Sequence, residues 1–363
     1  MRWLLKFFGI VFAIILISGT LFLLLFTRGS FFPYTEAIES AEGRSVAEMT
    51  SVVLGGMEQH LLMRGHDTEN PVLLWLHGGP GAAQMPFAHA FDRELEKHFV
   101  VVHWDQRGAG KSNTGDFDEA SLTLEQQLAD ALELVHWLRE RFGQERIFLL
   151  GHSWGTRIGI ELAAQHPELF YAYAGVSQVI DHARSTEIAY AWLLRRATLE
   201  ERWILGEIEP PAMSHHDYRR LAKIVEHRGG GTDLSITGLA RIALRAPEYG
   251  MRDNLQLLAG MNRGGKPMHA KGIIADYNLA ESIPELRLPV WFLNGRNDYN
   301  TPAELVREFY ESVEAPLKRF VLFPQAHTPF FASPDLFTST LIEMKAEVLN
   351  FHHPENPAAS ALP

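Results

Sequence analysis

The chain has 363 residues, with 33 Lys and Arg against 44 Asp and Glu, so its formal net charge is −11. Apolar residues make up 46% and charged residues 21%, a composition typical of a folded globular chain rather than a disordered one. The acidic balance argues against nucleic acid as a partner, because binding phosphates needs a concentrated Lys/Arg surface. The absence of cysteine excludes disulfides, thiolate metal sites and a cysteine nucleophile.

The N-terminus carries a long apolar segment. After Arg2 and Lys6, residues 7–26 form an uncharged apolar run of 20 residues, and a helix of that length spans about 30 Å, the thickness of a hydrocarbon core. A cleaved signal peptide is the alternative, with residues 18–20 as a small-residue site. The apolar run continues past that site, which favours an uncleaved anchor. The basic residues before the run favour a cytoplasmic N-terminus and a body outside the cytoplasm, in the periplasm of a Gram-negative cell.

From residue 72 onward, short apolar runs alternate with longer helix-like segments, the pattern of a mostly parallel sheet covered on both faces. The expected strands are residues 72–76, 99–104, 147–150, 172–176, 289–293 and 319–323. The expected helices are residues 124–142, 302–313 and 334–349. Thr301 and Ser333 each precede a proline and are predicted N-caps of the last two helices.

One segment breaks this alternation. Residues 178–283 are rich in Arg, Glu and His, contain few strand-like runs, and are predicted to form a helical insertion between two strands of the sheet. The expected organisation is therefore an anchor, a first core part, a helical cap, a second core part and a tail, at residues 1–28, 29–177, 178–285, 286–351 and 352–363.

A serine nucleophile is predicted at Ser153. Residues 151–155 match G-x-S-x-G, directly after one expected strand and directly before a helix-like run at 156–165. A sharp strand-to-helix turn exposes the serine hydroxyl, and the flanking glycines leave room for the backbone. The expected strand before the motif and the helix after it support Ser153 as the nucleophile more strongly than the five-residue pattern does.

A serine hydroxyl needs a base, and the base needs an orienting acid. In this arrangement the acid and then the histidine follow the serine on loops after later strands. Asp298 and His327 stand in those two loops. Glu304 competes with Asp298 as the acid, but it lies inside the following predicted helix and fits less well.

An oxyanion hole requires two backbone N–H donors. One is predicted from Trp154, directly after the nucleophile, and the other from the glycine-rich loop at residues 77–81 after an early strand. Gly79 is the preferred second donor, with Gly78 as the alternative.

Two other patterns do not predict a cofactor or a metal. Residues 108–112 look like the end of a phosphate-binding loop, but Asp105 stands where that motif needs glycine. The histidine pairs at 215–216 and 352–353 are adjacent, rather than at the i, i+4 spacing that places two imidazoles on one helix face. We therefore expect no cofactor and no metal.

These motifs together resemble the α/β-hydrolase fold and, within it, the prolyl aminopeptidase (proline iminopeptidase) family of serine peptidases. The resemblance rests on residues 77–81, 105–112 and 151–155 and covers roughly residues 45–350. It implies a mostly parallel, doubly wound α/β sheet with a helical cap over the active site, here preceded by a transmembrane helix. It also implies that Asp105 and Arg107 are framework residues beside the site.

Members that cleave N-terminal proline hold the free amine with cap glutamates, because a buried ammonium needs paired carboxylates. In the family such a glutamate commonly lies in a Trp-Glu pair, which residues 178–285 lack. The predicted substrate-binding candidates are Glu187, Glu200, Glu201 and Glu207, with Glu209 also available.

The sequence supports three functions. The first is an aminopeptidase that releases an N-terminal residue, with proline favoured, through a Ser-His-Asp triad and an acyl-enzyme. The second is a carboxylesterase or amidase of the same fold acting on small apolar esters. The third is a membrane-tethered binding protein without turnover, against which the complete triad argues. The expected partners are a small-molecule or short-peptide substrate and, through the N-terminal helix, a membrane.

Overall fold

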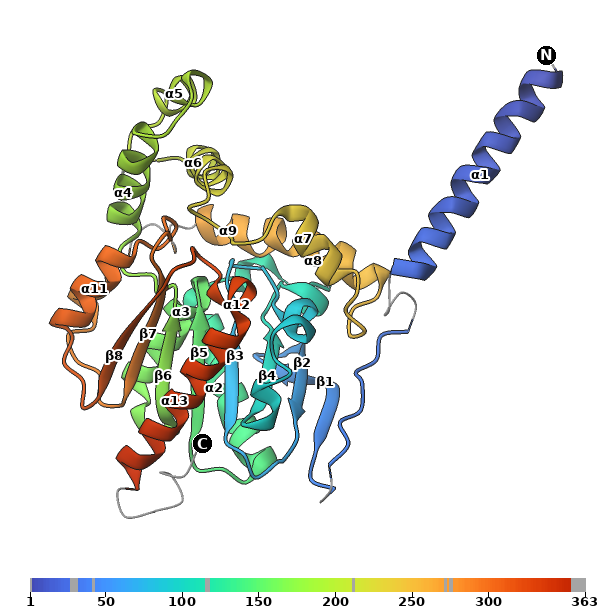
Figure 1. Ribbon diagram of the computed structural model, residues 1–363. Coiled ribbons are helices and arrows are strands. Elements are labelled where there is room, and N and C mark those ends of the chain that lie inside the picture. The colour runs from blue at the N-terminus through green and yellow to red at the C-terminus, as the bar shows by residue number, and fades with distance from the viewer. Residues whose placement is uncertain are drawn as a thin grey trace.

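The computed structural model describes residues 2–26, 32–40, 43–114, 118–210, 213–270, 273 and 277–353. Its centre is an eight-stranded sheet with the strand order β1-β2-β4-β3-β5-β6-β7-β8 (Figure 1). The strands are β1 (Val46–Leu54), β2 (Met57–Gly65), β3 (Val72–Leu76), β4 (Val100–Asp105), β5 (Ile147–His152), β6 (Phe170–Val176), β7 (Val290–Gly295) and β8 (Lys318–Phe323).

Strands β3 to β8 run parallel, so their C-terminal ends lie along one edge of the sheet. The antiparallel hairpin β1–β2 extends the sheet beyond β4. This hairpin is not among the strands predicted from the sequence. The reason is visible in β1, whose residues are mostly half-buried, because a strand at the edge of a sheet needs no continuous apolar run.

Alternate side chains of the buried strands pack into two hydrophobic cores, one on each face of the sheet. In β3, Leu74 packs on one side of the sheet and Trp75 on the other. The first core is covered by α2 (Leu124–Phe142), α3 (Trp154–Gln165) and α11 (Ala303–Ser312), and the second by α13 (Pro334–His352). The fold is therefore the predicted α/β arrangement, with helices on both faces of a mostly parallel sheet (Figure 1).

All six predicted strands are present, with ends within two residues of the expected ones, and helix 124–142 has the predicted bounds. The structure confirms Ser333 as an N-cap residue, whereas the prediction for Thr301 was wrong. Pro302 is the N-cap residue of α11, and the hydroxyl of Thr301 instead donates to Asp298. Ser333 is the N-cap residue of α13 without a side-chain capping bond, and its hydroxyl accepts a hydrogen bond from Gln325.

The described residues between β6 and β7 form helices joined by loops, with one bridge between Asp181 and Asn278 and another from Glu285 to Glu314. These helices are α4 (His182–Leu194), α5 (Leu199–Leu205), α6 (His215–His227), α7 (Ile236–Ala243), α8 (Met251–Arg263), α9 (Gly265–Ala270) and α10 (Leu279–Ser282). Most of them lie beyond the C-terminal edge of the parallel strands (Figure 1). Short helical turns complete the chain at Met85–Ala90, Leu95–Lys97, Gly110–Ser112, Glu119–Ser121, Pro167–Leu169 and, as α12, Pro329–Ala332.

Helix α1 (Arg2–Phe26) stands apart from this body, on the side where α7 and α8 lie (Figure 1). Its segment Trp3–Leu21 has a mean hydropathy of 2.3, and none of its most apolar stretch is buried. Among the described residues it is the one helix long and apolar enough to cross a membrane. A signal sequence would have the same properties.

Candidate active site

Ser153 occupies a sharp turn between β5 and α3. Its backbone has φ 51° and ψ −120°, a conformation that residues other than glycine rarely adopt. Such strained backbone is found at functional sites. The two glycines of the motif make the turn possible. A Cβ on Gly151 would lie 2.6 Å from the carbonyl oxygen of Gly155, and a Cβ on Gly155 would clash with the carbonyl oxygen of Leu76. The turn therefore needs glycine on both sides of the serine.

The structure brings the three predicted triad residues together. Asp298 follows β7, and His327 follows β8. Nε2 of His327 lies 2.9 Å from Oγ of Ser153, and Nδ1 lies 2.9 Å from Oδ2 of Asp298. The carboxylate keeps the proton on Nδ1, so that Nε2 is free to accept the serine proton.

The Asp298 carboxylate is fully committed to hydrogen bonds. Its Oδ1 accepts from the backbone N–H groups of Asn300 and Thr301, both at 2.9 Å. Its Oδ2 accepts from the Thr301 hydroxyl at 2.7 Å as well as from His327. Burial alone would raise the pKa of Asp298, but the facing imidazole and these donors lower it below the ordinary value. Asp298 is therefore a buried, ionised partner for His327.

The interaction with Asp298 also makes His327 a stronger base. Burial disfavours its charged form, but the charge of Asp298 and the hydrogen bond between them outweigh burial and raise the pKa of His327 above its ordinary value. Glu226 and Asp233 of the helical insertion act in the same direction. The imidazole can thus hold the proton that Ser153 releases.

The two predicted oxyanion donors flank the serine. Trp154 is the first residue of α3, where the backbone N–H has no acceptor within its own helix. The loop after β3 approaches from the other side, since a Cβ on Gly78 would lie 3.1 Å from Cβ of Ser153. Gly79 has φ 119°, which only glycine adopts readily. Gly79 and Trp154 both line the cavity that contains Ser153.

This cavity is small, about 60 Å³. It is lined by Gly79, Ser153, Trp154, Arg157, Val179, His182, Ser185, Tyr218, Ile273, Tyr277, Asn300 and Thr301. Four of these residues, His182, Ser185, Tyr218 and Asn300, also line a second cavity of about 20 Å³ between α4 and α6. Arg157 is the one Lys or Arg in the lining described here, and it pairs with Glu161 and lies 3.5 Å from the ring centre of Tyr277.

Comparison with known proteins agrees with this geometry. Residues 71–213 match the family model of the alpha/beta hydrolase fold. The "Probable aminopeptidase YbaC" of Bacillus subtilis (strain 168) is 34% identical over 311 residues, which cover 83% of this chain and 96% of that relative. The chain belongs to the α/β-hydrolase family, among its proline iminopeptidase-like members.

More distant matches carry related names. A proline iminopeptidase of Lactobacillus delbrueckii subsp. lactis is 26% identical to this hydrolase over 285 residues, which cover 76% of this chain and 90% of the relative. The crystal structure of proline iminopeptidase from Mycobacterium smegmatis aligns with a TM-score of 0.62 at 22% identity, covering 83% of this chain and 98% of that one. At that identity the structural match shows the fold alone.

The four glutamates predicted to hold a substrate amine do not line the Ser153 cavity. Glu201 caps α5 through Thr198 and binds Arg228. Glu207 pairs with Arg220 at 2.6 Å, and Glu187 and Glu200 are exposed. Three of the four stand on α5 or directly after it, and α5 lies at the outer end of the insertion in Figure 1. Glu201 and Glu207 therefore pair with arginines of the insertion itself and not with a group in the Ser153 cavity.

Two further residues of this hydrolase hold the His327 loop, and neither was predicted from the sequence as a site residue. Nε2 of His152 lies 3.1 Å from the backbone carbonyl oxygen of His327, and the Ser177 hydroxyl donates to the same oxygen at 2.9 Å. Burial lowers the pKa of His152 to about 3, so its ring is neutral and donates through Nε2. Ser177, with φ 52°, follows β6 directly. Its unusual backbone is not visible in a sequence.

The helical insertion also binds the His327 loop, through residues 229–233. Oδ1 of Asp233 accepts from the backbone N–H of Ala326 at 2.8 Å, and Oδ2 accepts from that of Thr328 at 2.9 Å. The N–H of His327 itself donates to the carbonyl oxygen of Gly231 at 3.0 Å. One carboxylate therefore holds the residues on both sides of His327. No sequence motif marks Asp233.

Asp105 and Arg107 lie in the framework, as the resemblance implied. Arg107 forms an ion pair with Asp130 at 2.7 Å, and both side chains are almost fully buried. Asp105 accepts from the N–H of Lys111 at 2.8 Å and from the hydroxyl of Tyr249. These bonds tie the loop after β4 to α2 and to the insertion.

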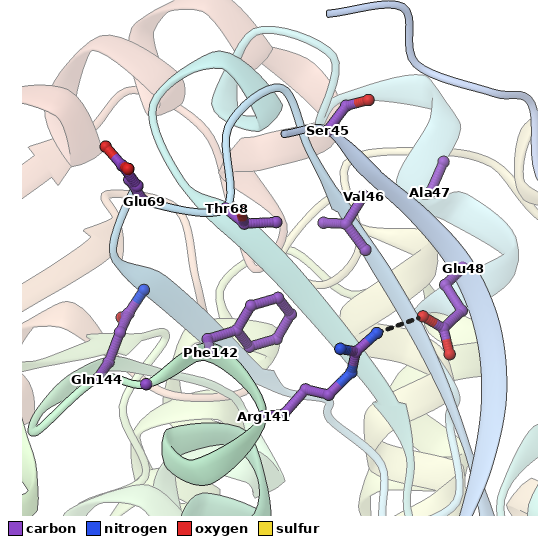
Figure 2. Close-up of a pocket in the computed structure, with 10 residues that line it drawn as sticks. Ser45, Val46, Ala47, Glu48, Thr68, Glu69, Arg141, Phe142 and Gln144 are labelled. Atoms are coloured by element: carbon purple, nitrogen blue, oxygen red, sulfur yellow. Dashed lines mark hydrogen bonds and ion pairs between the residues drawn. The ribbon is translucent and has the colours of Figure 1, made fainter. Parts of the chain in front are cut away.

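A larger hollow of about 710 Å³ lies at the opposite edge of the sheet, near the start of β1 and the end of α2. Figure 2 shows Arg141 paired with Glu48 on its wall, and the two side chains are 3.0 Å apart. The hydroxyl of Ser45, also in this wall, donates to the carbonyl oxygen of Ile38. Within the described ranges, no group of three or more His, Asp and Glu side chains could hold a metal ion. The chemistry of acyl transfer is available only at Ser153 among the hollows described here.

Proposed function

We propose that this protein is a serine hydrolase that works through an acyl-enzyme on Ser153. The observation that carries the proposal is the continuous hydrogen-bonded series from Ser153 through His327 to the buried Asp298, with both links at 2.9 Å. A nucleophile, a base and an orienting acid in this order are the parts that acyl transfer needs.

In the first step His327 Nε2 takes the proton of Ser153, and Oγ attacks the carbonyl carbon of the substrate. The N–H groups of Trp154 and Gly79 stabilise the developing oxyanion. His327 then gives its proton to the leaving amine or alcohol, which leaves an acyl-serine. A water molecule, activated by the same imidazole, hydrolyses this ester and restores the enzyme.

The bond that this protein cleaves is proposed to be the one after an N-terminal residue, as in an aminopeptidase with proline favoured. The aminopeptidase and proline iminopeptidase names of the relatives support this choice. The cavity of about 60 Å³ is well below the roughly 300–1,000 Å³ of sites for drug-sized ligands. A single small acyl group, such as one amino-acid residue, fits that description better than a long chain.

One observation favours a second candidate, an esterase or amidase for small uncharged acyl groups. Among the described lining residues of the cavity there is no aspartate or glutamate, although a buried ammonium needs a carboxylate partner. A substrate without a free amine would need no such partner.

A parallel assay separates the two candidates. Initial rates would be measured with proline naphthylamide, its N-acetylated form and short acyl nitrophenyl esters, and with Ser153→Ala as the control for background. Hydrolysis of the free-amine amide and loss of activity on acetylation support the aminopeptidase. Equal rates on both amides, or hydrolysis of the esters alone, support the second candidate.

We also propose that α1 anchors the enzyme in a membrane, with the N-terminus in the cytoplasm and the catalytic body on the other side. The apolar segment Trp3–Leu21, which is unburied, and the basic residues Arg2 and Lys6 support this topology. The test is fractionation of cells that express the full chain, followed by alkaline carbonate extraction. Full-length protein that stays in the membrane pellet is the expected result, and intact protein in the soluble fraction contradicts the anchor.

A further inference from the structure

The outward face of α8 is apolar. Leu255, Leu258 and Met261 expose 66%, 69% and 59% of their surfaces. At about 100° per residue, side chains spaced three apart fall within an arc of about 120°, so the three form one stripe. Ile236, at the start of α7, is 81% exposed. Large apolar side chains gathered on one exposed face mark an interaction surface.

The inward face of the same helix is packed against the catalytic core. Gly260 is buried, and a Cβ at that position would lie 2.9 Å from the carbonyl oxygen of Gly81 and 3.3 Å from that of Gly108. Only a glycine allows this close approach. The opposite face of α8 is therefore already packed on the loop that carries Gly79. The exposed stripe is not the face by which this helix packs on the core.

The chain that leaves α1 is bound next to α8. The N–H of Tyr34 donates to the carbonyl oxygen of Pro247 at 2.9 Å, and the Thr35 hydroxyl donates to Glu248 at 3.1 Å. Pro247 lies three residues before Gly250, the N-cap residue of α8. From Phe26, at the end of α1, to Tyr34 the chain can extend no further than about 26–29 Å. A membrane crossed by α1 is thus within short reach of α8, which Figure 1 places beside the end of α1.

The charge around the stripe differs from that of the whole protein. Residues 236–266 contain five Arg and Lys residues against two acids, Glu248 and Asp253, whereas the chain has a formal net charge of −11. Glu248 is buried, and Asp253 pairs with Lys111 at 2.5 Å. The exposed cations of this segment are Arg241, Arg245, Arg252 and Lys266. Exposed cationic side chains in the segment that carries an apolar stripe match a surface of anionic lipid headgroups.

We propose that the α8 stripe, with Ile236 of α7, lies on the surface of the membrane that α1 spans. The inference rests on the anchoring proposed above for α1. Helix α8 then acts as an interfacial amphipathic helix, with Leu255, Leu258 and Met261 among the headgroups and upper acyl chains. The body would be held by two membrane contacts, the transmembrane helix and the face of the insertion that covers the oxyanion loop.

Site-directed spin labelling of the full chain in liposomes tests this orientation, and the chain has no native cysteine to interfere. A nitroxide at Leu258→Cys is compared with one at Phe351→Cys. Phe351 is also an exposed apolar side chain, 44% accessible, but its neighbour His352 contacts Tyr171 at the start of β6, at the opposite end of the sheet. A third label, at Ile15→Cys in α1, reports whether that helix is in the hydrocarbon.

Power saturation with oxygen, which concentrates in lipid, and with a water-soluble nickel complex gives the depth of each label. The expected result is an oxygen-to-nickel accessibility ratio at residue 258 several-fold higher than at residue 351. The ratio at 258 should fall toward that at 351 when Leu255→Glu is added or when anionic lipid is replaced by zwitterionic lipid in high salt.

Three results would overturn the proposal, and they are distinguishable. A label at 258 as accessible to nickel as the one at 351, with the label at 15 in lipid, leaves the anchor in place and removes the docking. A label at 15 that is itself accessible to nickel removes the anchor and the docking together. Protection of 258 from both reagents with spin–spin broadening shows that a second copy of the chain covers the stripe.

Discussion

The C-terminal edge of the sheet and the helical insertion above it use their charged residues in opposite ways. At the edge of the sheet, Asp298 is buried and accepts four hydrogen bonds, one of them from His327. In the insertion, Glu201 and Glu207 pair with arginines of the insertion itself. The comparison indicates that the core holds the chemistry in a defined geometry, whereas the insertion shapes the cavity mainly with uncharged side chains.

The two regions meet at the loop of residues 229–233. Asp233 holds the backbone on both sides of His327, and the carbonyl oxygen of Gly230 accepts from the N–H of Tyr299, next to Asp298. The insertion therefore contributes to the position of the base and the acid as well as to the wall of the cavity. The following predictions test this division, in order of decreasing effect.

Removal of the nucleophile or the base should have the largest effect. Ser153→Ala and His327→Ala should each lower kcat by about 10⁴-fold or more, because the triad acts as a unit. The measurement is kcat on the best substrate of the parallel assay. Unchanged circular dichroism and thermal midpoint serve as the control for folding. Hydrolysis by purified Ser153→Ala at a rate near that of the wild type would contradict the assignment.

A methyl group in the turn of the core should be far more harmful than one in the insertion. Gly155→Ala places a Cβ against the carbonyl oxygen of Leu76, so we expect a loss of about 1–3 kcal/mol or more in the free energy of unfolding. We also expect nearly complete loss of activity. Gly206→Ala is the matched control, since its nearest neighbours are 3.4 Å away and its backbone is right-handed. Urea denaturation of both variants checks this, and equal stabilities would contradict it.

Activity should decline as the pH falls through the pKa of His327. Only neutral His327 can accept the serine proton, so kcat/KM should fall about tenfold per pH unit below that pKa. Because Asp298 raises the pKa, the inflection should lie above the ordinary value of about 6.5. His152, with a pKa of about 3, stays neutral throughout. In Asp298→Asn the residual activity should titrate at lower pH, and an unshifted inflection would show that His327 is not the titrating base.

Weakening the contact between the insertion and the His327 loop should have an intermediate effect on activity. Asp233→Asn can accept only one of the two N–H donors beside His327, and an unpaired donor costs about 1–3 kcal/mol. If half of this cost is lost from the active arrangement of His327, kcat should drop by about 2- to 12-fold, since 1.4 kcal/mol corresponds to a factor of ten.

Two further readouts separate positioning from general structure in Asp233→Asn. The inflection of the pH profile should move down, because Asp233 helps to raise the pKa of His327, and KM should change less than kcat. Glu187→Gln, at an exposed position of α4, is the control and should behave like the wild type. A lower thermal midpoint with an unchanged pH profile and kcat would show that Asp233 has no positioning role.

The smallest effect on substrate choice is expected from Glu201→Gln. The side chains of Arg228 and Glu201 are 25% and 12% exposed in their ion pair, and a glutamine at position 201 can still accept hydrogen bonds from Arg228 and Thr198. The thermal midpoint should therefore fall slightly, while the ratio of rates on free-amine and N-blocked substrates stays within about twofold. A selective loss of about 30-fold on the free-amine substrate would instead place Glu201 at the amine site.

The sequence by itself determined the chemistry of the core. The turn at Ser153 depends in part on near neighbours, because a Cβ on Gly151 would clash with the backbone of Gly155, four residues along the chain. The buried parallel strands are continuous apolar runs, so their positions, and with them the loops of Asp298 and His327, could be read along the chain. Local sterics and local periodicity are properties that a single sequence displays.

Only the tertiary structure decided which residues meet across long distances in the chain. Glu201 is committed to Arg228, and Asp233 to the backbone beside His327. A carboxylate or hydroxyl has several possible partners of similar strength, and burial and packing select among them. The half-buried strand β1 was missed for a related reason, since its place at the sheet edge depends on pairing with β2 and leaves no apolar run to recognise.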